Sequence, residues 1–136
     1  MKVMVCLDDK GGMLFGNRRQ SRDRVLSADV VQMASSSRLC IDPYSMLLFE
    51  GSEADILCDK DFLDLAADND YCFVENRALA SYVDKIDELV IYHWNRKYPT
   101  DTFFDIDVKK SGFVLVSAED FAGYSHDKIT KEIFRK

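Results

Sequence analysis

Asp29 is the acid that the sequence best places to meet a ligand. It stands in the run Leu26-Ser27-Ala28-Asp29-Val30, with apolar residues on both sides. A carboxylate beside an apolar wall pairs well with a planar set of N–H donors and can protonate a ring. Ser27 is a candidate helix N-cap, and the helix dipole alone favours an acid in a first turn. The ligand-facing and the helix-stabilising interpretations of Asp29 both stay open.

A cluster of arginines precedes this acid. Within seven residues of an otherwise acidic chain, the sequence places Arg18, Arg19, Arg22 and Arg24. Guanidinium groups match the paired oxygens of phosphate and carboxylate. The cluster therefore predicts a site for an anionic ligand, and a solvated polar loop is the competing interpretation.

The thiols and imidazoles do not form a recognisable reactive motif. The cysteines lie in short apolar runs without a CxxC or zinc spacing: Cys6, Cys40, Cys58 and Cys72. We expect all four to be buried and reduced, because free cysteine is among the most buried residue types. His93 and Trp94 are expected to pack on a strand. His126 is expected to be a turn residue, since no nucleophile can be placed beside it from sequence. No metal site is predicted.

Composition excludes several classes of partner. The 136 residues are 47% hydrophobic, which suits one domain with a substantial core. The net charge of −6 argues against nucleic-acid binding, which needs a basic face. No apolar run is long enough for a signal peptide or a membrane span, so we expect a cytoplasmic protein. The sequence specifies no oligomeric state.

Strands and helices alternate over the first two thirds of the chain. Short apolar runs bounded by turn residues predict strands at 2–8, 38–41, 54–58 and 71–75. Helical segments are expected from Ser27, over 44–49, after Asp61 and over 79–86. In the last of these, four apolar residues fall at i, i+3, i+4 and i+7: Leu79, Tyr82, Val83 and Ile86.

The last third reads as strands only, over 88–98, 112–117 and 128–135. In the final run, alternation places Ile129, Lys131 and Ile133 on one face. Strand–helix units followed by an antiparallel pair predict an α/β fold. We expect a single domain over 1–136, with a mostly parallel central sheet, helices on both faces and an antiparallel C-terminal strand pair.

The order and spacing of these segments resemble dihydrofolate reductases. The closing half of that family is matched by Glu88-Leu89-Val90-Ile91-Tyr92-His93, Asp101-Thr102-Phe103-Phe104, Phe113-Val114-Leu115-Val116-Ser117 and Glu132-Ile133-Phe134. Leu26-Ser27-Ala28-Asp29-Val30 resembles the family's Leu-Pro-Ala-Asp-Leu, which carries the single acid of the active site. The resemblance covers nearly the whole chain, with a compressed middle.

The resemblance implies a pterin-type pocket whose acid is Asp29. It places Met33 and Tyr92 beside that acid, with Tyr92 where the family has a threonine that hydrogen-bonds it. Arg24 falls where the family has the tryptophan of the first loop, which Asp8 through Gly16 resembles. Asp29 is thus the expected ligand-facing acid, and Met33, Tyr92 and Arg24 are the expected substrate-binding residues.

The cofactor positions depart from the family pattern. A Gly-Gly pair that lets backbone approach the cofactor pyrophosphate reads Glu75-Asn76 here, and the family's Gly-Arg-x-Thr reads Asp42-Pro43-Tyr44-Ser45. The arginine that would pair the 2′-phosphate of NADPH is absent. We therefore expect no cofactor to be bound at these positions.

These inferences predict a divergent dihydrofolate reductase-like protein without NADPH-dependent reductase activity, which binds a small planar or anionic ligand near Asp29. The alternatives are an active NAD(P)H-dependent oxidoreductase of pterins or folates, and a protein-interaction scaffold. An open pocket at Asp29 favours ligand binding or catalysis. A pocket filled by Arg24, Tyr92 or Met33 favours the scaffold.

Overall fold

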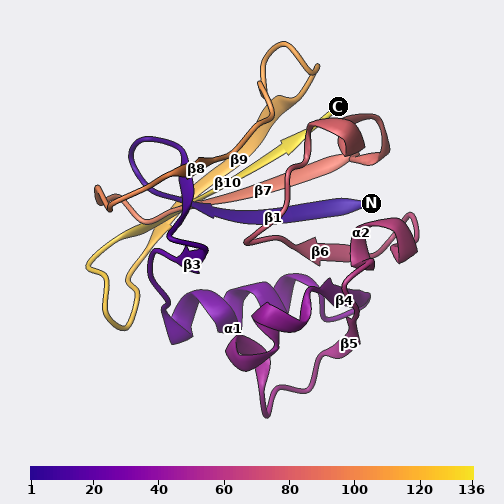
Figure 1. The fold of residues 1–136 in the computed structure, drawn as a ribbon, viewed down its shortest axis with the longest axis horizontal. Helices are drawn as coiled ribbons and strands as arrows, with labels where there is room; N and C mark the ends of the chain where they lie inside the picture. The colour runs from indigo at the N-terminus through magenta and orange to yellow at the C-terminus, as the bar shows by residue number, and fades with distance from the viewer.

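A seven-stranded sheet with the order β5-β4-β6-β1-β7-β10-β9 forms the centre of the computed structural model, which describes residues 1–136 (Figure 1). Its strands are β1 (Lys2–Leu7), β4 (Arg38–Ile41), β5 (Asp55–Cys58), β6 (Tyr71–Phe73), β7 (Glu88–His93), β9 (Val114–Phe121) and β10 (Ile129–Arg135). Neighbouring strands from β5 to β7 are parallel, and β10 is antiparallel to β7 and β9. The expected α/β architecture, with a mostly parallel sheet and an antiparallel C-terminal pair, is confirmed.

Helical segments cover both faces of this sheet, as expected. On one face lie α1 (Arg24–Met33) and η1 (Pro43–Phe49), and α1 runs alongside the sheet in Figure 1. The other face is covered in part by α2 (Phe62–Leu65) and η2 (Ala80–Lys85). Two apolar cores result, one on each side. Strands such as β1 are therefore apolar at successive positions instead of alternating with polar residues.

Helix α1 begins earlier than the sequence suggested. Asp23 is its N-cap, with a side chain that accepts a hydrogen bond from the Val25 N–H at 2.9 Å, so the helix starts at Arg24 and not at Ser27. Asp29 consequently lies in the middle of the helix. The interpretation of Asp29 as a first-turn acid is wrong, because the helix dipole acts mainly at the first turn.

Two other elements differ in detail from expectation. The segment predicted as a helix over 79–86 is the short 3₁₀ helix η2, although its apolar face is the predicted one, with Leu79 and Ile86 buried. The strand predicted over 88–98 ends at His93. Asn95 follows with φ of 60°, a left-handed conformation that cannot continue a strand.

A small second sheet in the order β3-β2-β8 was not predicted. It consists of β2 (Gly12–Phe15), β3 (Arg18–Arg19) and β8 (Thr102–Phe103). Gly16 and Asn17 join β2 to β3, and both have positive φ, as a two-residue hairpin turn of the favoured primed type requires. This hairpin fixes the direction in which the arginines of β3 leave the chain.

All four cysteines are free and lie on strands of the main sheet. Cys40 and Cys72 are buried and Cys6 is half-buried, but Cys58 is exposed. The expectation of four buried thiols is therefore wrong for Cys58. It lies on β5, an edge strand of the sheet, which has a neighbouring strand, β4, on one side only.

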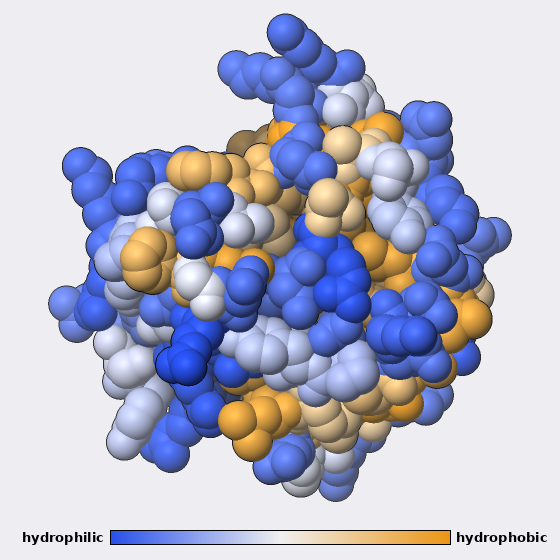
Figure 2. All heavy atoms as spheres, in the orientation of Figure 1, coloured by the Kyte–Doolittle hydropathy of each residue, from blue (hydrophilic) through white to orange (hydrophobic).

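None of the helices has the length and apolar character that crossing a membrane would require. On the face drawn in Figure 2, hydrophilic side chains predominate and the apolar residues appear in separate groups.

Candidate functional site

The Asp29 carboxylate is already occupied by two groups of the protein. The Tyr92 hydroxyl donates a hydrogen bond to Oδ2 at 2.5 Å. The Lys131 ammonium lies 2.9 Å from Oδ2 and 3.2 Å from Oδ1, and 3.8 Å from the sulfur of Met33. The structure thus brings Asp29, Tyr92 and Met33 together and adds a lysine that the sequence had not singled out as a partner of Asp29.

Lys131 neutralises this acid in a sheltered position. Its side chain is 9% exposed and lies between Asp29 and Glu119, with Glu119 Oε1 at 3.0 Å. Burial alone would lower the pKa of Lys131, but hydrogen bonds with the two carboxylates outweigh burial and raise it. A ligand with N–H donors would have to displace both Lys131 and Tyr92. By the criterion stated above, a site filled in this way favours the scaffold interpretation at Asp29.

An open pocket lies nearby, at the start of α1, and Asp29 does not line it. Its walls include Cys6 of β1, Phe73 of β6, Trp94, Leu26 and Arg22. About 390 Å³ is empty when the open mouth is counted. The side chains leave room inside for only about one or two water molecules, so a bicyclic ring does not fit without rearrangement.

Two acids line this pocket, Glu75 and Asp23, and Asp23 is the N-cap of α1. The Asp23 carboxylate is fully buried and accepts hydrogen bonds from the backbone N–H groups of Val25, Tyr124 and Ser125, each at 2.9 Å. Burial alone would raise the pKa of Asp23, but these donors together with His126 lower it well below its usual range. A Cβ on Gly123 would lie 2.5 Å from Asp23 Oδ2, so only glycine permits this approach of the β9–β10 loop.

His126 connects Asp23 to two hydroxyl groups. Its Nδ1 lies 2.9 Å from Asp23 Oδ2, while its Nε2 lies 3.1 Å from Ser21 Oγ and 2.9 Å from Tyr98 Oη. The ring is buried and stacks on Trp94 with centroids 4.5 Å apart. The sequence allowed no nucleophile to be placed beside His126, and the structure places Ser21 there. Ser21 is 105 positions away in the chain, a separation that no local motif could have indicated.

The first position that the resemblance assigns to the cofactor, Glu75-Asn76, holds an ion pair. Arg19 donates from Nε to Glu75 Oε2 at 2.8 Å and from Nη2 to Oε1 at 3.0 Å. Ser45 Oγ donates to the same Oε1 at 2.7 Å, and the Arg19 guanidinium stacks on the ring of Tyr44. The hydrogen bonds to Glu75 raise the pKa of Arg19 further above its ordinary value.

A second ion pair occupies the neighbouring position. Arg77 donates to the Asp42 carboxylate, and also to Asn76 Oδ1 at 2.9 Å. Asp42 caps η1 by accepting from the Tyr44 N–H at 2.8 Å, with Pro43 in the first turn. The residues that replace the family's cofactor-binding pattern therefore form a connected polar network within the chain.

The four arginines predicted as one cluster have separate roles. Arg19 pairs with Glu75, and Arg24 stacks over the ring of Tyr124 at 3.6 Å from the centroid. Arg18 is exposed on β3.

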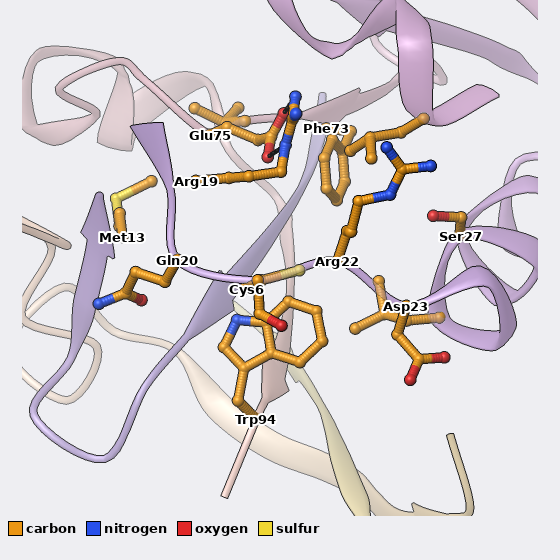
Figure 3. Close-up of a pocket in the computed structure, with 14 residues that line it drawn as sticks. Cys6, Met13, Arg19, Gln20, Arg22, Asp23, Ser27, Phe73, Glu75 and Trp94 are labelled. Atoms are coloured by element: carbon orange, nitrogen blue, oxygen red, sulfur yellow. Dashed lines mark hydrogen bonds and ion pairs between the residues drawn. The ribbon is translucent and has the colours of Figure 1, made fainter. Parts of the chain in front are cut away.

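Arg22 extends toward Ser27 beside Phe73 in Figure 3, and its guanidinium makes no ion pair. Arg22 also borders an open groove between α1 and the loop after η1, so it is the free cation at both hollows.

Comparison with known proteins supports the fold. A dihydrofolate reductase from Enterococcus faecalis, complexed with NADP(H) and RAB-propyl, superposes with a TM-score of 0.68 over 98% of this chain and 94% of that chain. The sequences are 10% identical. No protein-family model and no curated protein matches the sequence. The chain therefore has a dihydrofolate reductase-like fold.

Proposed function

We propose that this chain is a dihydrofolate reductase-like protein without NADPH-dependent reductase activity, which retains a pocket for a small anionic ligand at Arg22. The observation that carries the first part is the Arg19–Glu75 ion pair. This ion pair lies at the position where, according to the family resemblance, the backbone would contact the cofactor pyrophosphate.

Glu75 opposes a phosphate in two ways. A carboxylate repels the phosphate charge at short range. Its side chain is only 8% exposed, so releasing Arg19 to a phosphate would leave the Glu75 charge buried without its partner. Breaking one side of a buried pair costs about 3–5 kcal/mol. Cofactor binding would have to supply that free energy before any net affinity appeared.

The geometry at Arg22 supports an anionic ligand more than the geometry at Asp29 supports a planar one. Asp29 is neutralised by Lys131, whereas Arg22 has no partner and borders both hollows. Guanidinium groups bind phosphate and carboxylate through two parallel hydrogen bonds. A compact anion can contact Arg22 from the open mouth of the pocket, whereas the small interior excludes a folate-sized molecule.

An NADPH titration followed by cofactor fluorescence tests the loss of cofactor binding. We expect no saturable change in the micromolar range, with the Enterococcus faecalis dihydrofolate reductase as the positive control. Saturable micromolar binding would instead favour the active oxidoreductase.

Inorganic pyrophosphate tests the anion site. Its effect on the melting temperature should disappear in Arg22→Gln and persist in Arg18→Gln, which removes an exposed arginine outside both hollows. An equal response in the two variants would leave only nonspecific binding and overturn the site at Arg22.

A further inference from the structure

Ser21, His126 and Asp23 are joined in the order that activates a serine hydroxyl for attack on an acyl group. Oγ lies 3.1 Å from Nε2, and Nδ1 lies 2.9 Å from the carboxylate. Serine hydrolases of unrelated folds use the same succession of hydroxyl, imidazole and carboxylate, and the arrangement is recognised by geometry instead of chain order.

The buried part of this arrangement is rigidly held. Backbone N–H groups from α1 and from the β9–β10 loop converge on the Asp23 carboxylate, and Trp94 stacks on the imidazole. An ionised Asp23 accepts a hydrogen bond from Nδ1–H. In the neutral ring with its proton on Nδ1, Nε2 is the nitrogen that can accept a proton, and it lies within hydrogen-bond distance of the Ser21 hydroxyl, as a general base must.

We propose that Ser21 is the nucleophile of a second activity, the hydrolysis of esters that carry a short acyl group. Ser21 lines the pocket whose walls include Cys6, Leu26, Phe73 and Trp94. These apolar walls suit the hydrocarbon part of an acyl group, and the limited space restricts it to about the size of acetyl. This activity does not depend on whether the chain binds NADPH.

The reaction uses water as its only co-reactant. Ser21 Oγ attacks the ester carbonyl carbon while His126 Nε2 takes the hydroxyl proton. The tetrahedral oxyanion collapses, the C–O bond to the alcohol breaks, and the alcohol leaves with the proton from Nε2. Water then attacks the acyl-serine with His126 again as the base, which releases a carboxylic acid and restores Ser21.

Donors for the oxyanion are available next to the nucleophile. The backbone N–H groups of Ser21 and Arg22 make no hydrogen bond within the chain. In other serine hydrolases the N–H of the residue after the nucleophile contributes to the oxyanion hole, and each such donor has a large effect on rate. Arg22 follows Ser21 and supplies that N–H here.

Tyr98 competes with Ser21 for the imidazole. Its hydroxyl lies 2.9 Å from Nε2, and one lone pair accepts only one strong hydrogen bond at a time. Removing this hydroxyl should leave Nε2 to Ser21 and raise the reactivity of the serine. A purely structural link between loops predicts no gain of reactivity in Tyr98→Phe.

Labelling with a fluorophosphonate that carries a short alkyl chain tests the proposal directly. Mass spectrometry of the intact protein and its peptides should find a single adduct on Ser21. Ser21→Ala should abolish it, while Ser37→Ala, a serine beyond the far end of α1, should label as the unmodified protein does. Hydrolysis of p-nitrophenyl acetate should fall about 100-fold or more in Ser21→Ala, and Tyr98→Phe should accelerate labelling.

A Ser21→Cys variant keeps the test informative if the alanine variant folds poorly. The thiol of this variant should react with iodoacetamide faster than the same thiol in the double variant Ser21→Cys, His126→Gln. The reason is that the imidazole of His126 favours the thiolate, which is the reactive form. An unlabelled Ser21 in the folded protein, or equal p-nitrophenyl acetate turnover in Ser21→Ala, would overturn the proposal. The NADPH titration is unaffected by either result, so the two proposals fail separately.

Discussion

Lys131 of β10 and Asp29 of α1 form an ion pair across the interface between helix and sheet, with Nζ 2.9 Å from Oδ2. The lysine is 9% exposed and the aspartate 26% exposed. The pair joins the helix to β10, next to the edge strand β9, and the Tyr92 hydroxyl donates a hydrogen bond to the same carboxylate. The acid that the family resemblance assigns to ligand recognition thus has a structural partner in this chain.

Asp29→Asn should destabilise the protein at neutral pH, because Lys131 would remain sheltered with only the exposed Glu119 as a charged partner. We expect a loss of about 1–3 kcal/mol in the free energy of unfolding. Urea unfolding at pH 7 measures it. Glu119→Gln is the control, with a loss below about 1 kcal/mol, since that carboxylate is 58% exposed. An unchanged or higher urea midpoint for Asp29→Asn would contradict the structural role.

The pH dependence of this pair has a defined sign. The folded-state pKa of Lys131 is raised, so its contribution to stability is fully present below the unfolded pKa of about 10.4 and is lost as the pH rises through the higher folded value. The difference between the unmodified protein and Asp29→Asn should therefore be constant near neutrality and shrink above about pH 10.4.

Arg19 and Glu75 should show strong energetic coupling. The two side chains are 16% and 8% exposed, and Glu75→Ala would leave the guanidinium without its carboxylate. We expect Glu75→Ala to lower the free energy of unfolding by about 2–4 kcal/mol. In the double variant Arg19→Ala, Glu75→Ala, the free energy of unfolding should fall by about 1–3 kcal/mol less than the sum of the losses in the two single variants. A double-mutant cycle from urea unfolding measures this coupling. Additive losses would mean that the pair contributes no specific interaction.

Local sequence patterns predicted the sheet well, because its strands are short apolar runs with their own turn residues. Alternation in 128–135 correctly placed Lys131 on the face of Ile129, and that face carries α1. The start of α1 was missed although Leu26, Val30 and Ala34 recur every four residues and are all buried. Giving that period more weight than the capping preference of Ser27 would have placed the start of the helix nearer Asp23.

The contacts of the site could not be predicted in the same way. Asp23 and His126 are 103 positions apart, Asp29 and Lys131 are 102 apart, and Arg19 and Glu75 are 56 apart. Each pair joins elements that meet only after the sheet has formed. Periodicity and capping rules act over a few residues, so they identify charged residues without indicating which of them pair.

The thiols should fall into distinct classes of reactivity. Cys58 is exposed, whereas Cys40 and Cys72 are fully buried. Burial raises the pKa of the Cys6 thiol well above its usual value, and the nearby Glu75 charge adds a smaller increase. Because the thiolate is the reactive form, we expect one fast reaction with a disulfide reagent in the native protein and the other three after unfolding. Cys58→Ser should remove the fast phase. Its persistence in that variant would place the accessible thiol elsewhere.

The Asp23 carboxylate should be a main source of acid sensitivity. Burial opposes its charge, but the backbone donors of Tyr124, Ser125 and Val25 and the imidazole of His126 hold its folded-state pKa far below the unfolded value of about 3.9. A lowered pKa gives stability that is fully present above the unfolded pKa and is lost as the pH falls toward the folded one. The unmodified protein should therefore lose stability steeply below about pH 4.

Asp23→Asn cannot ionise, so it should be less stable than the unmodified protein by about 2–4 kcal/mol at pH 7, with a smaller difference at pH 3. Chemical unfolding at both pH values provides the comparison. Asp42→Asn, which changes the cap of η1 and also removes the charge that pairs with Arg77, is the control and should leave the His126 contacts intact. If the difference between Asp23→Asn and the unmodified protein is the same at pH 3 and pH 7, the carboxylate does not contribute through its charge, and Asp23 acts only as a hydrogen-bonding cap of α1.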